Sequence, residues 1–193
     1  MADFFRIVSR SADILYVTEN DKTTMRLGVT GTQTASCVTV EAKAEFTKIV
    51  STFAITEMHH GGCQGGDAAM HNMVDDLFGD TCSIYIHQPV DKTKAQFLLG
   101  KNVTLLNAKH YLERNKDIVD ASNVMIAMPK GMEEELRSGT WMTVRDTVKK
   151  RKPLYVVWPD GTCTYIGPDN KSKPSWWTQT KWPRDAKQST LCF

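Results

Sequence analysis

The residues with the clearest chemical potential form a polar segment, Glu133 to Trp141, between an apolar run and a stretch with helical character. The run at 124–128 predicts a strand, and residues 142–150 predict a helix. A small-residue loop leading from a strand into a helix leaves backbone N–H groups free, and such helix N-termini favour phosphates. Arg137 adds a guanidinium that can pair with phosphate oxygens. We therefore predict that a phosphorylated ligand contacts Arg137, Ser138, Gly139, Thr140 and Trp141.

A glycine-rich segment, His59 to Asp67, follows another predicted strand. Its four glycines within six positions let the backbone approach a ligand closely. Asp67 is expected to cap or enter the first turn of the next helix. The adjacent His59 and His60 do not indicate a metal site, because neighbours on an extended chain point to opposite faces and no acid or cysteine pair completes one. We expect one histidine at the ligand and one buried, with His60, Gly61 and Asp67 as candidates. A turn that merely lets helix and strand pack is the alternative.

Two further loops and one helix supply the remaining candidates. The loops at 30–33 and 87–89 each follow a predicted strand, and loops after parallel strands open on the same edge of a sheet. A short predicted helix before the strand at 124–128 carries an arginine and an asparagine that either reach this edge or face water. The candidate ligand contacts from these segments are Gly31, Thr32, Gln33, His87, Arg114 and Asn115. No metal ion and no separate cofactor is predicted.

The elements that must position these residues alternate along the chain. Predicted strands occupy 25–30, 52–56, 82–86, 124–128 and 153–158, and predicted helices occupy 40–50, 68–78, 111–119 and 142–150. Residues 91–107 are assigned no element, and residues 14–17 have the composition of a short extra strand. Because several strands are wholly apolar and alternate with helices, we predict an α/β fold with a mainly parallel sheet and helices on both faces.

The chain divides into three parts by composition. An N-terminal extension covers 1–24, a central domain covers 25–166, and a C-terminal tail rich in tryptophan and proline covers 167–193. The tail has neither helical nor strand periodicity. We expect it to pack its tryptophans on the domain or on a neighbouring subunit, in preference to acting as a lid or an interaction arm.

Composition narrows the class of protein. A chain of 193 residues with 41% hydrophobic residues can bury a sizeable core as one globular domain. The formal net charge of +2 disfavours a nucleic-acid binder that works through a broad basic field. No apolar run is long enough to span a bilayer, and the first residues lack the apolar core of a signal peptide. The five scattered cysteines form no C-x-x-C pair, so we expect reduced thiols and a cytoplasmic location.

Together these segments resemble the SLOG superfamily of Rossmann-like nucleotide-binding proteins, which includes the LOG phosphoribohydrolases and DNA-processing protein A. The resemblance covers about residues 25–161 and is carried by the blocks at 28–33, 59–67, 111–120 and 135–141. It implies a Rossmann-like fold and a nucleotide-like small molecule as ligand. It also implies a homo-oligomer, because SLOG relatives commonly form dimers or larger assemblies.

The resemblance also bears on catalysis. LOG enzymes hydrolyse a nucleoside monophosphate with an arginine on the helix before the fourth strand, to which Arg114 is similar. They also use a glutamate just after a glycine-rich loop, to which Gly139 and Thr140 are similar. The position expected for that glutamate is Thr143, so the usual agent of protonation or water activation is missing.

Two functions from different classes remain open. The first is non-catalytic binding of a phosphorylated nucleotide-derived ligand, such as a cyclic ADP-ribose-type or cyclic nucleotide immune signal, by a sensor or a viral sponge. The resemblance implies this role because SLOG domains sense such signals in bacterial antiviral defence. The second is a nucleotide N-glycosidase of LOG type, with Glu135 or Asp67 as acid or base and Arg114 positioning the phosphate. Nucleic-acid binding, as in DNA-processing protein A, is disfavoured by the small net charge.

Overall fold

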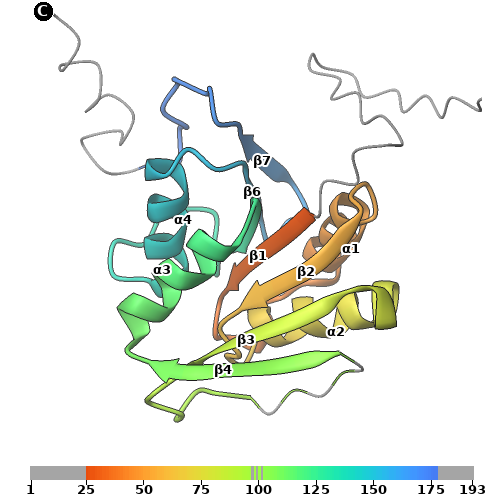
Figure 1. Cartoon of the computed structure of the whole chain (residues 1–193). Coiled ribbons are helices and arrows are strands. Elements are labelled where there is room, and N and C mark those ends of the chain that lie inside the picture. Colours follow the sequence, from red (N-terminus) through yellow and green to blue (C-terminus); the bar gives the residue numbers. More distant parts are fainter. Residues whose placement is uncertain (1–24, 97, 99, 101, 178–193) are drawn as a thin grey trace, which may run out of the picture.

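The protein, described here by a computed structural model over residues 25–96, 98, 100 and 102–177, has one sheet between two layers of helices (Figure 1). The expected extension at 1–24, with its strand at 14–17, lies outside the described residues, as does the tail beyond residue 177. The layered arrangement of helices and strands confirms the predicted α/β class.

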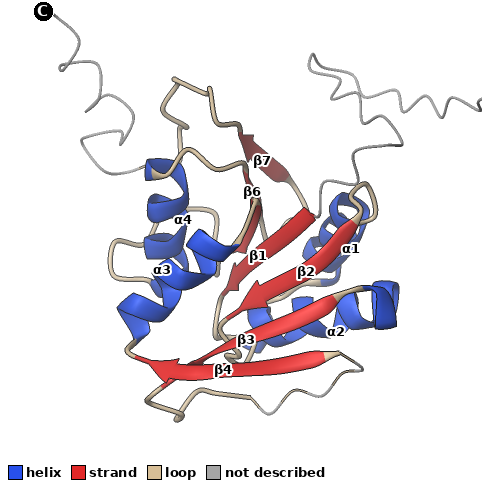
Figure 2. Cartoon of the chain, in the orientation of Figure 1, coloured by secondary structure: helices blue, strands red, loops and turns tan. Residues whose placement is uncertain are grey.

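A seven-stranded sheet forms the middle layer (Figure 2). Its strands are β1 (Met25–Gly31), β2 (Ile55–His60), β3 (Ser83–Pro89), β4 (Val103–Lys109), β5 (Val124–Met128), β6 (Leu154–Val157) and β7 (Cys163–Ile166). Their order is β4-β3-β2-β1-β5-β6-β7, and every neighbouring pair is parallel except β6 and β7. The order changes direction between β1 and β5, which is the switch point where ligands of such sheets collect.

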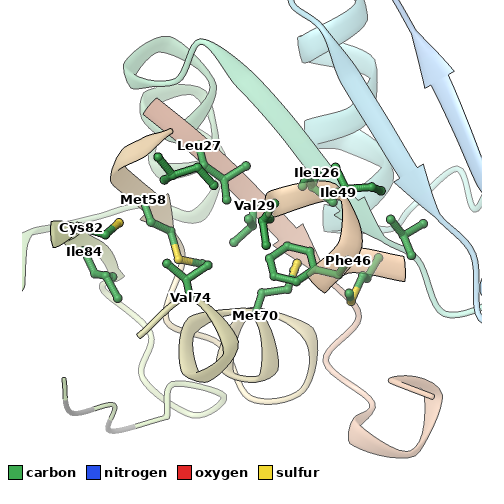
Figure 3. Close-up of a cluster of buried hydrophobic side chains, with 14 of the residues drawn as sticks. Leu27, Val29, Phe46, Ile49, Met58, Met70, Val74, Cys82, Ile84 and Ile126 are labelled. Atoms are coloured by element: carbon green, nitrogen blue, oxygen red, sulfur yellow. The ribbon is translucent and has the colours of Figure 1, made fainter. Parts of the chain in front are cut away.

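Four helices cover the two faces of the sheet. They are α1 (Val40–Val50), α2 (Gly66–Phe78), α3 (Tyr111–Ala121) and α4 (Gly139–Lys149). On one face, Phe46 of α1 and Met70 and Val74 of α2 belong to the same buried cluster as Leu27 and Val29 of β1 (Figure 3). Burying one such side chain contributes about 1.5–3 kcal/mol, so this cluster fixes α1 and α2 against the sheet.

The other face carries a second core, formed with α3 and α4. Ile118 of α3 and Val144 of α4 pack with Met125 and Ala127 of β5. The alternate residues of β5 belong to the first cluster, and the whole strand is buried. Burial on both faces explains why the run at 124–128 is apolar at every position.

Helix α4 begins at Gly139, three residues before its predicted start. Ser138 is its N-cap, and the Ser138 hydroxyl accepts a hydrogen bond from the Trp141 N–H at 3.5 Å. A serine in this position satisfies one of the free N–H groups of the first turn. Residues 138–141 of the polar segment identified in the sequence are therefore the cap and first turn of α4.

Four strands differ from those expected. Strand β2 lies three residues later than predicted, at Ile55–His60, so its two histidines are strand residues and not loop residues. Strand β3 continues to Pro89 and includes His87. Strands β4 and β7 were not predicted; β4 is an edge strand with mostly exposed side chains, and β7 has only four residues. Neither shows the apolar pattern that a buried strand requires.

Candidate functional site

The loops that follow β1, β2, β3 and β5 enclose a pocket of about 670 Å³ at the carboxyl edge of the sheet. This edge is where the loops after parallel strands were expected to meet. Nine of its lining residues were named from the sequence: Gly31, Thr32, Gln33, Arg114, Glu135, Arg137, Ser138, Gly139 and Thr140. The volume lies within the range of about 300–1,000 Å³ that holds small organic ligands in proteins.

Arg114 forms a buried part of the pocket wall. It is 3% exposed, and its guanidinium carbon lies 4.9 Å from the centre of the Tyr111 ring. One terminal nitrogen, Nη2, donates to the sulfur of Cys63 at 3.5 Å, whereas Nε has no hydrogen-bond partner within the described part of the chain. Among the described residues no carboxylate lies within ion-pair distance of Arg114. A buried charge without an ion pair raises the free energy of the folded protein. Arg114 is therefore a candidate to bind an anion.

Asp67 lies beneath the pocket and not on its surface. Its carboxylate accepts backbone hydrogen bonds from Gly31 at 3.0 Å, Gly61 at 3.2 Å and Cys63 at 3.3 Å. Burial raises the pKa of Asp67, and the positive charge of Arg114 partly offsets this effect. The carboxylate therefore positions two loops of the pocket, which is a different role from the predicted ligand contact.

Close backbone contact between Gly31 and Gly66 brings the first loop onto the start of α2. A side-chain carbon on Gly31 would come within 2.6 Å of the Gly66 Cα, so neither glycine can be replaced without movement. The Gly66 N–H donates to the Thr32 carbonyl at 2.7 Å. The Thr140 hydroxyl donates to the Gly31 carbonyl at 2.9 Å, which joins the same loop to α4.

The N-terminus of α4 opens into the pocket. Gly139 and Thr140 line it, and no partner is recorded for their backbone N–H groups within the described residues. Tyr111 lies so close to Gly139 that a side chain there would overlap the tyrosine hydroxyl. Lys130 and Arg137, from the loop before the helix, add two cationic side chains to the lining. This end of the pocket has the donors and the dipole direction that bind phosphate.

The buried pair of His60 and His71 supports the backbone of the glycine-rich loop. His60 is fully buried, and its Nε2 lies 2.9 Å from His71 Nδ1. The Gly62 N–H donates to His60 Nδ1 at 3.0 Å, so His60 carries its proton on Nε2 and donates it to His71. Burial lowers the pKa of His60 well below its usual value and keeps it neutral. The expectation that His60 contacts the ligand is therefore corrected: its ring holds the backbone at Gly62.

His87 also lies away from the pocket lining, contrary to expectation. Its Nε2 is 3.2 Å from His59 Nδ1, and His59 Nε2 is 3.3 Å from a Glu57 carboxylate oxygen. The His59 ring stacks on Tyr85 with 5.0 Å between ring centres. Burial, followed by the charge of His59, lowers the pKa of His87 to about 4. These residues form a packed cluster on the sheet because they are strand residues.

Three other candidates also lie outside the pocket lining. Trp141 is 1% exposed and packs in the second core, with its ring centre 5.2 Å from that of Trp176 and 5.9 Å from that of Trp158. Asn115 is buried, and its side chain is hydrogen-bonded to Tyr111. Gly61 lies beside Arg114, where a side-chain carbon would overlap the guanidinium Nη1. These residues shape or support the pocket without lining it.

Trp176 and Trp177 of the C-terminal tail pack in the second core. The distance between their ring centres is 6.0 Å, and Trp177 is buried. Trp182 lies outside the described residues. The described tryptophans of the tail therefore pack on the domain.

Several lining residues were not named as candidates from the sequence. They are Thr34, Cys63, Pro89, Val90, Asp91, Thr93, Lys94, His110, Tyr111 and Lys130. Cys63 belongs to the glycine-rich segment, and this membership was its only sequence signal. Burial, together with the Asp67 carboxylate, raises the pKa of the Cys63 thiol, so it is not activated as a nucleophile.

The catalytic carboxylate of LOG enzymes has no counterpart at its expected position. Thr143 is 1% exposed, and its hydroxyl donates to the Gly139 carbonyl at 3.1 Å. The carboxylates on the pocket lining are Asp91 and Glu135. Asp91 accepts a hydrogen bond from the Thr93 N–H of its own loop at 2.9 Å, whereas the Glu135 carboxylate has no partner among the described residues.

Within the described ranges, no group of three or more metal-ligating side chains is placed to hold a metal ion. No helix of the same residues has the length and apolar character needed to cross a membrane.

Comparison with solved structures places this arrangement in a known fold. The structural-genomics protein TM1055 superposes with a TM-score of 0.50 and 13% identity, over 68% of this chain and 72% of that one. The molybdenum cofactor binding protein of the phototrophic bacterium Rippkaea orientalis gives a TM-score of 0.51 and 15% identity, over 72% and 78%. The protein shares the Rossmann-like α/β fold of these two structures. The molybdenum cofactor carrier protein MCP of Chlamydomonas reinhardtii is similar with a TM-score of 0.45 and 23% identity, over 69% and 76%.

This likeness, together with the order of the seven strands, confirms the predicted Rossmann-like class. No family model and no curated protein sequence matches the chain. At these identities the likeness is one of fold, so the function must be argued from the pocket itself.

Proposed function

We propose that this protein is a non-catalytic binder of a phosphorylated, nucleotide-derived ligand. The observation that carries the proposal is Arg114: a guanidinium that is 3% exposed, lines the pocket and has no ion pair among the residues that the structure describes. Charge-assisted hydrogen bonds to a phosphate would satisfy its free nitrogens. A neutral ligand would leave the buried charge uncompensated, so the ligand we expect is an anion.

The free N–H groups at the start of α4, which also lines the pocket, support the same conclusion. They lie beside Lys130 and Arg137, and the lining holds four cationic side chains against two carboxylates. Tyr111 supplies an aromatic surface on which a base or sugar can pack. Phosphate donors, aromatic surface and a volume of about 670 Å³ together suit a nucleotide.

The absence of a carboxylate at Thr143 favours holding the ligand over cleaving it. We therefore propose sequestration or sensing of a cyclic ADP-ribose-type or cyclic nucleotide immune signal, as a viral sponge or a related sensor. Such a role requires slow release and no bond breaking. A protein with the same fold is named a molybdenum cofactor binding protein, which supports small-molecule binding as a use of this fold.

We propose a cytoplasmic homo-oligomer whose working unit is the domain at 25–166. The free thiols of Cys37, Cys63, Cys82 and Cys163 are compatible with a reducing compartment. Nucleic acid is not the partner we propose, since the net charge is only +2.

One observation favours a second candidate, a nucleotide N-glycosidase of LOG type. Glu135 lines the same pocket as Arg114 and is exposed, and its carboxylate has no hydrogen bond or ion pair among the described residues. An unpaired carboxylate near a bound nucleotide can act as a general acid or base. Asp67, the other acid considered, is engaged by three backbone N–H groups and is less suited to this role.

To test this proposal, the full chain is incubated with candidate nucleotides and free ligand is removed. The protein is then denatured by heat, and mass spectrometry identifies the small molecules that it releases. Release of the intact ligand is expected. Release of free base and a phosphorylated sugar, lost in Glu135→Gln, would replace the binder with the glycosidase. Arg114→Ala should retain no ligand, whereas Lys116→Ala, an exposed cation on the same helix α3, should retain it fully.

A further inference from the structure

The segment between β3 and β4 forms one wall of the pocket through Pro89, Val90, Asp91, Thr93 and Lys94. An isolated antiparallel bridge joins Cys63 to Ala95. The Gln64 N–H donates to the Lys94 carbonyl at 3.0 Å, and the Gln96 N–H donates to the Gly62 carbonyl at 2.9 Å. These backbone bonds fasten the segment to the glycine-rich loop, so Lys94 has a defined place on the wall.

Lys94 is a cation on this wall without an ion pair among the described residues. The acid on its own loop, Asp91, is held by the Thr93 N–H at 2.9 Å. Hydrogen bonds from Thr93 are the main cause of the lowered pKa of Asp91, and the charge of Lys94 is the smallest cause. The ammonium group of Lys94 therefore remains available to a ligand.

The other cations of the pocket come from different elements. Arg114 belongs to α3, and Lys130 and Arg137 belong to the loop between β5 and α4. Lys94 stands on the β3–β4 wall, so it comes from a different element of the pocket than Arg114 and the start of α4. The pocket volume of about 670 Å³ is also much larger than a single phosphate group needs.

We infer that the ligand carries two phosphate groups separated by a neutral part, and that Lys94 binds the second phosphate. This inference rests on the proposed function, which assigns the first phosphate to Arg114 and α4. It narrows the ligand class to nucleotides with separated phosphates, such as a nucleoside 3′,5′-bisphosphate or a cyclic dinucleotide. Lys94 is then the residue that distinguishes these ligands from a nucleoside monophosphate.

The test is titration calorimetry at low ionic strength with AMP, ADP and adenosine 3′,5′-bisphosphate as probes. The wild-type protein should bind the bisphosphate about threefold to fivefold more tightly than AMP, which is the scale of one exposed ion pair. Lys94→Ala should remove this preference, and Lys94→Arg should restore it. Lys92→Ala is the matched control, because Lys92 belongs to the same loop but lines a neighbouring hollow of about 270 Å³.

The outcomes separate the inference from the proposed function. Equal binding of AMP and the bisphosphate, a preference that survives in Lys94→Ala, or tighter binding of ADP than of the bisphosphate would each overturn the inference. In those cases AMP binding that depends on Arg114 would leave the proposed function standing. Failure of the wild-type protein to bind any of the three nucleotides would overturn both.

Discussion

The Asp67 carboxylate accepts a hydrogen bond from the Gly31 backbone N–H at 3.0 Å, and this bond joins the end of β1 to the start of α2. The second carboxylate oxygen accepts from Gly61 at 3.2 Å and from Cys63 at 3.3 Å. One buried side chain thus positions both the first loop and the glycine-rich loop. The geometry of the pocket depends on this group, although the group itself does not reach the lining.

Replacing Asp67 with asparagine should destabilise the protein by about 2 kcal/mol, because an amide turns an NH2 group toward at least one backbone N–H that then lacks an acceptor. Urea unfolding measures this loss. Asp76→Asn, at an exposed position of the same helix, is the control and should change the unfolding free energy by less than about 0.5 kcal/mol. Equal stability of the Asp67 variant and the wild type would show that the three bonds do not hold the loops.

Replacing Arg114 with methionine should separate binding from stability. The variant keeps the side-chain length but removes the guanidinium, so nucleotide affinity should fall by about tenfold or more. The melting temperature should stay the same or rise, because a buried charge without an ion pair is removed. Calorimetry and thermal unfolding provide the two readings, with Lys116→Met as control. A melting temperature lowered by several degrees would mean that Arg114 stabilises the fold without a ligand.

Replacing Gly61 with alanine should displace Arg114 without unfolding the domain. The added carbon overlaps Nη1 of Arg114 and comes within 2.9 Å of Asp67 Oδ2. We expect nucleotide affinity to fall by about tenfold while the far-ultraviolet circular dichroism is unchanged. Gly131→Ala is the matched control, since no atom lies within 4 Å of the carbon added there. Full affinity in the Gly61 variant would argue against a ligand role for the Arg114 position.

The histidine cluster should make stability depend on pH. The pKa of His87 is about 4 in the folded protein against an ordinary 6.5, so the unfolded chain takes up a proton first on acidification. The unfolding free energy should therefore fall as the pH falls from about 6.5 toward 4. His59 and His60 act in the same direction because burial lowers their pKa values. Asp67 acts in the opposite direction, since its raised pKa lets the folded state gain a proton first.

Urea unfolding at pH 7 and pH 5 tests this dependence. His87→Gln should show a smaller loss of stability between the two values than the wild type does. His110→Gln, at an exposed position before α3, should keep the full loss. An unchanged loss in the His87 variant would remove His87 as a source of the effect.

The parts of the fold that could be predicted from the sequence are those whose burial is visible in local pattern. The run at 124–128 is apolar throughout because both faces of β5 are covered. Strand β4 could not be predicted, because it is an edge strand with exposed residues such as Leu105. The shift of β2 has a similar cause: His59 and His60 are polar by type, yet they are buried strand residues that neighbouring rings satisfy.

Residues of the site could be predicted where the backbone of a helix N-terminus forms the pocket. They were harder to predict where a residue's role depends on the direction in which its side chain points. Ser138, Gly139 and Thr140 lie in the pocket because the cap of a helix after a parallel strand must face that edge. Trp141, one position later, is turned by about 100° around the helix axis and enters the core instead. The pairing of Cys63 with Ala95 joins residues far apart in the chain, and no local pattern reports such a contact.

The strand order has a mechanical consequence. The sheet has two halves, β4 to β1 and β5 to β7, and the β1–β5 pair is the seam between them. At the pocket the seam continues through the Thr32 N–H, which donates to the Met128 carbonyl at 2.8 Å. Lys94 stands on one half and Arg137 on the other. A ligand that contacts both residues would link the two halves of the sheet. It should slow amide hydrogen exchange along β1 and β5 and reduce motion of the two halves relative to each other.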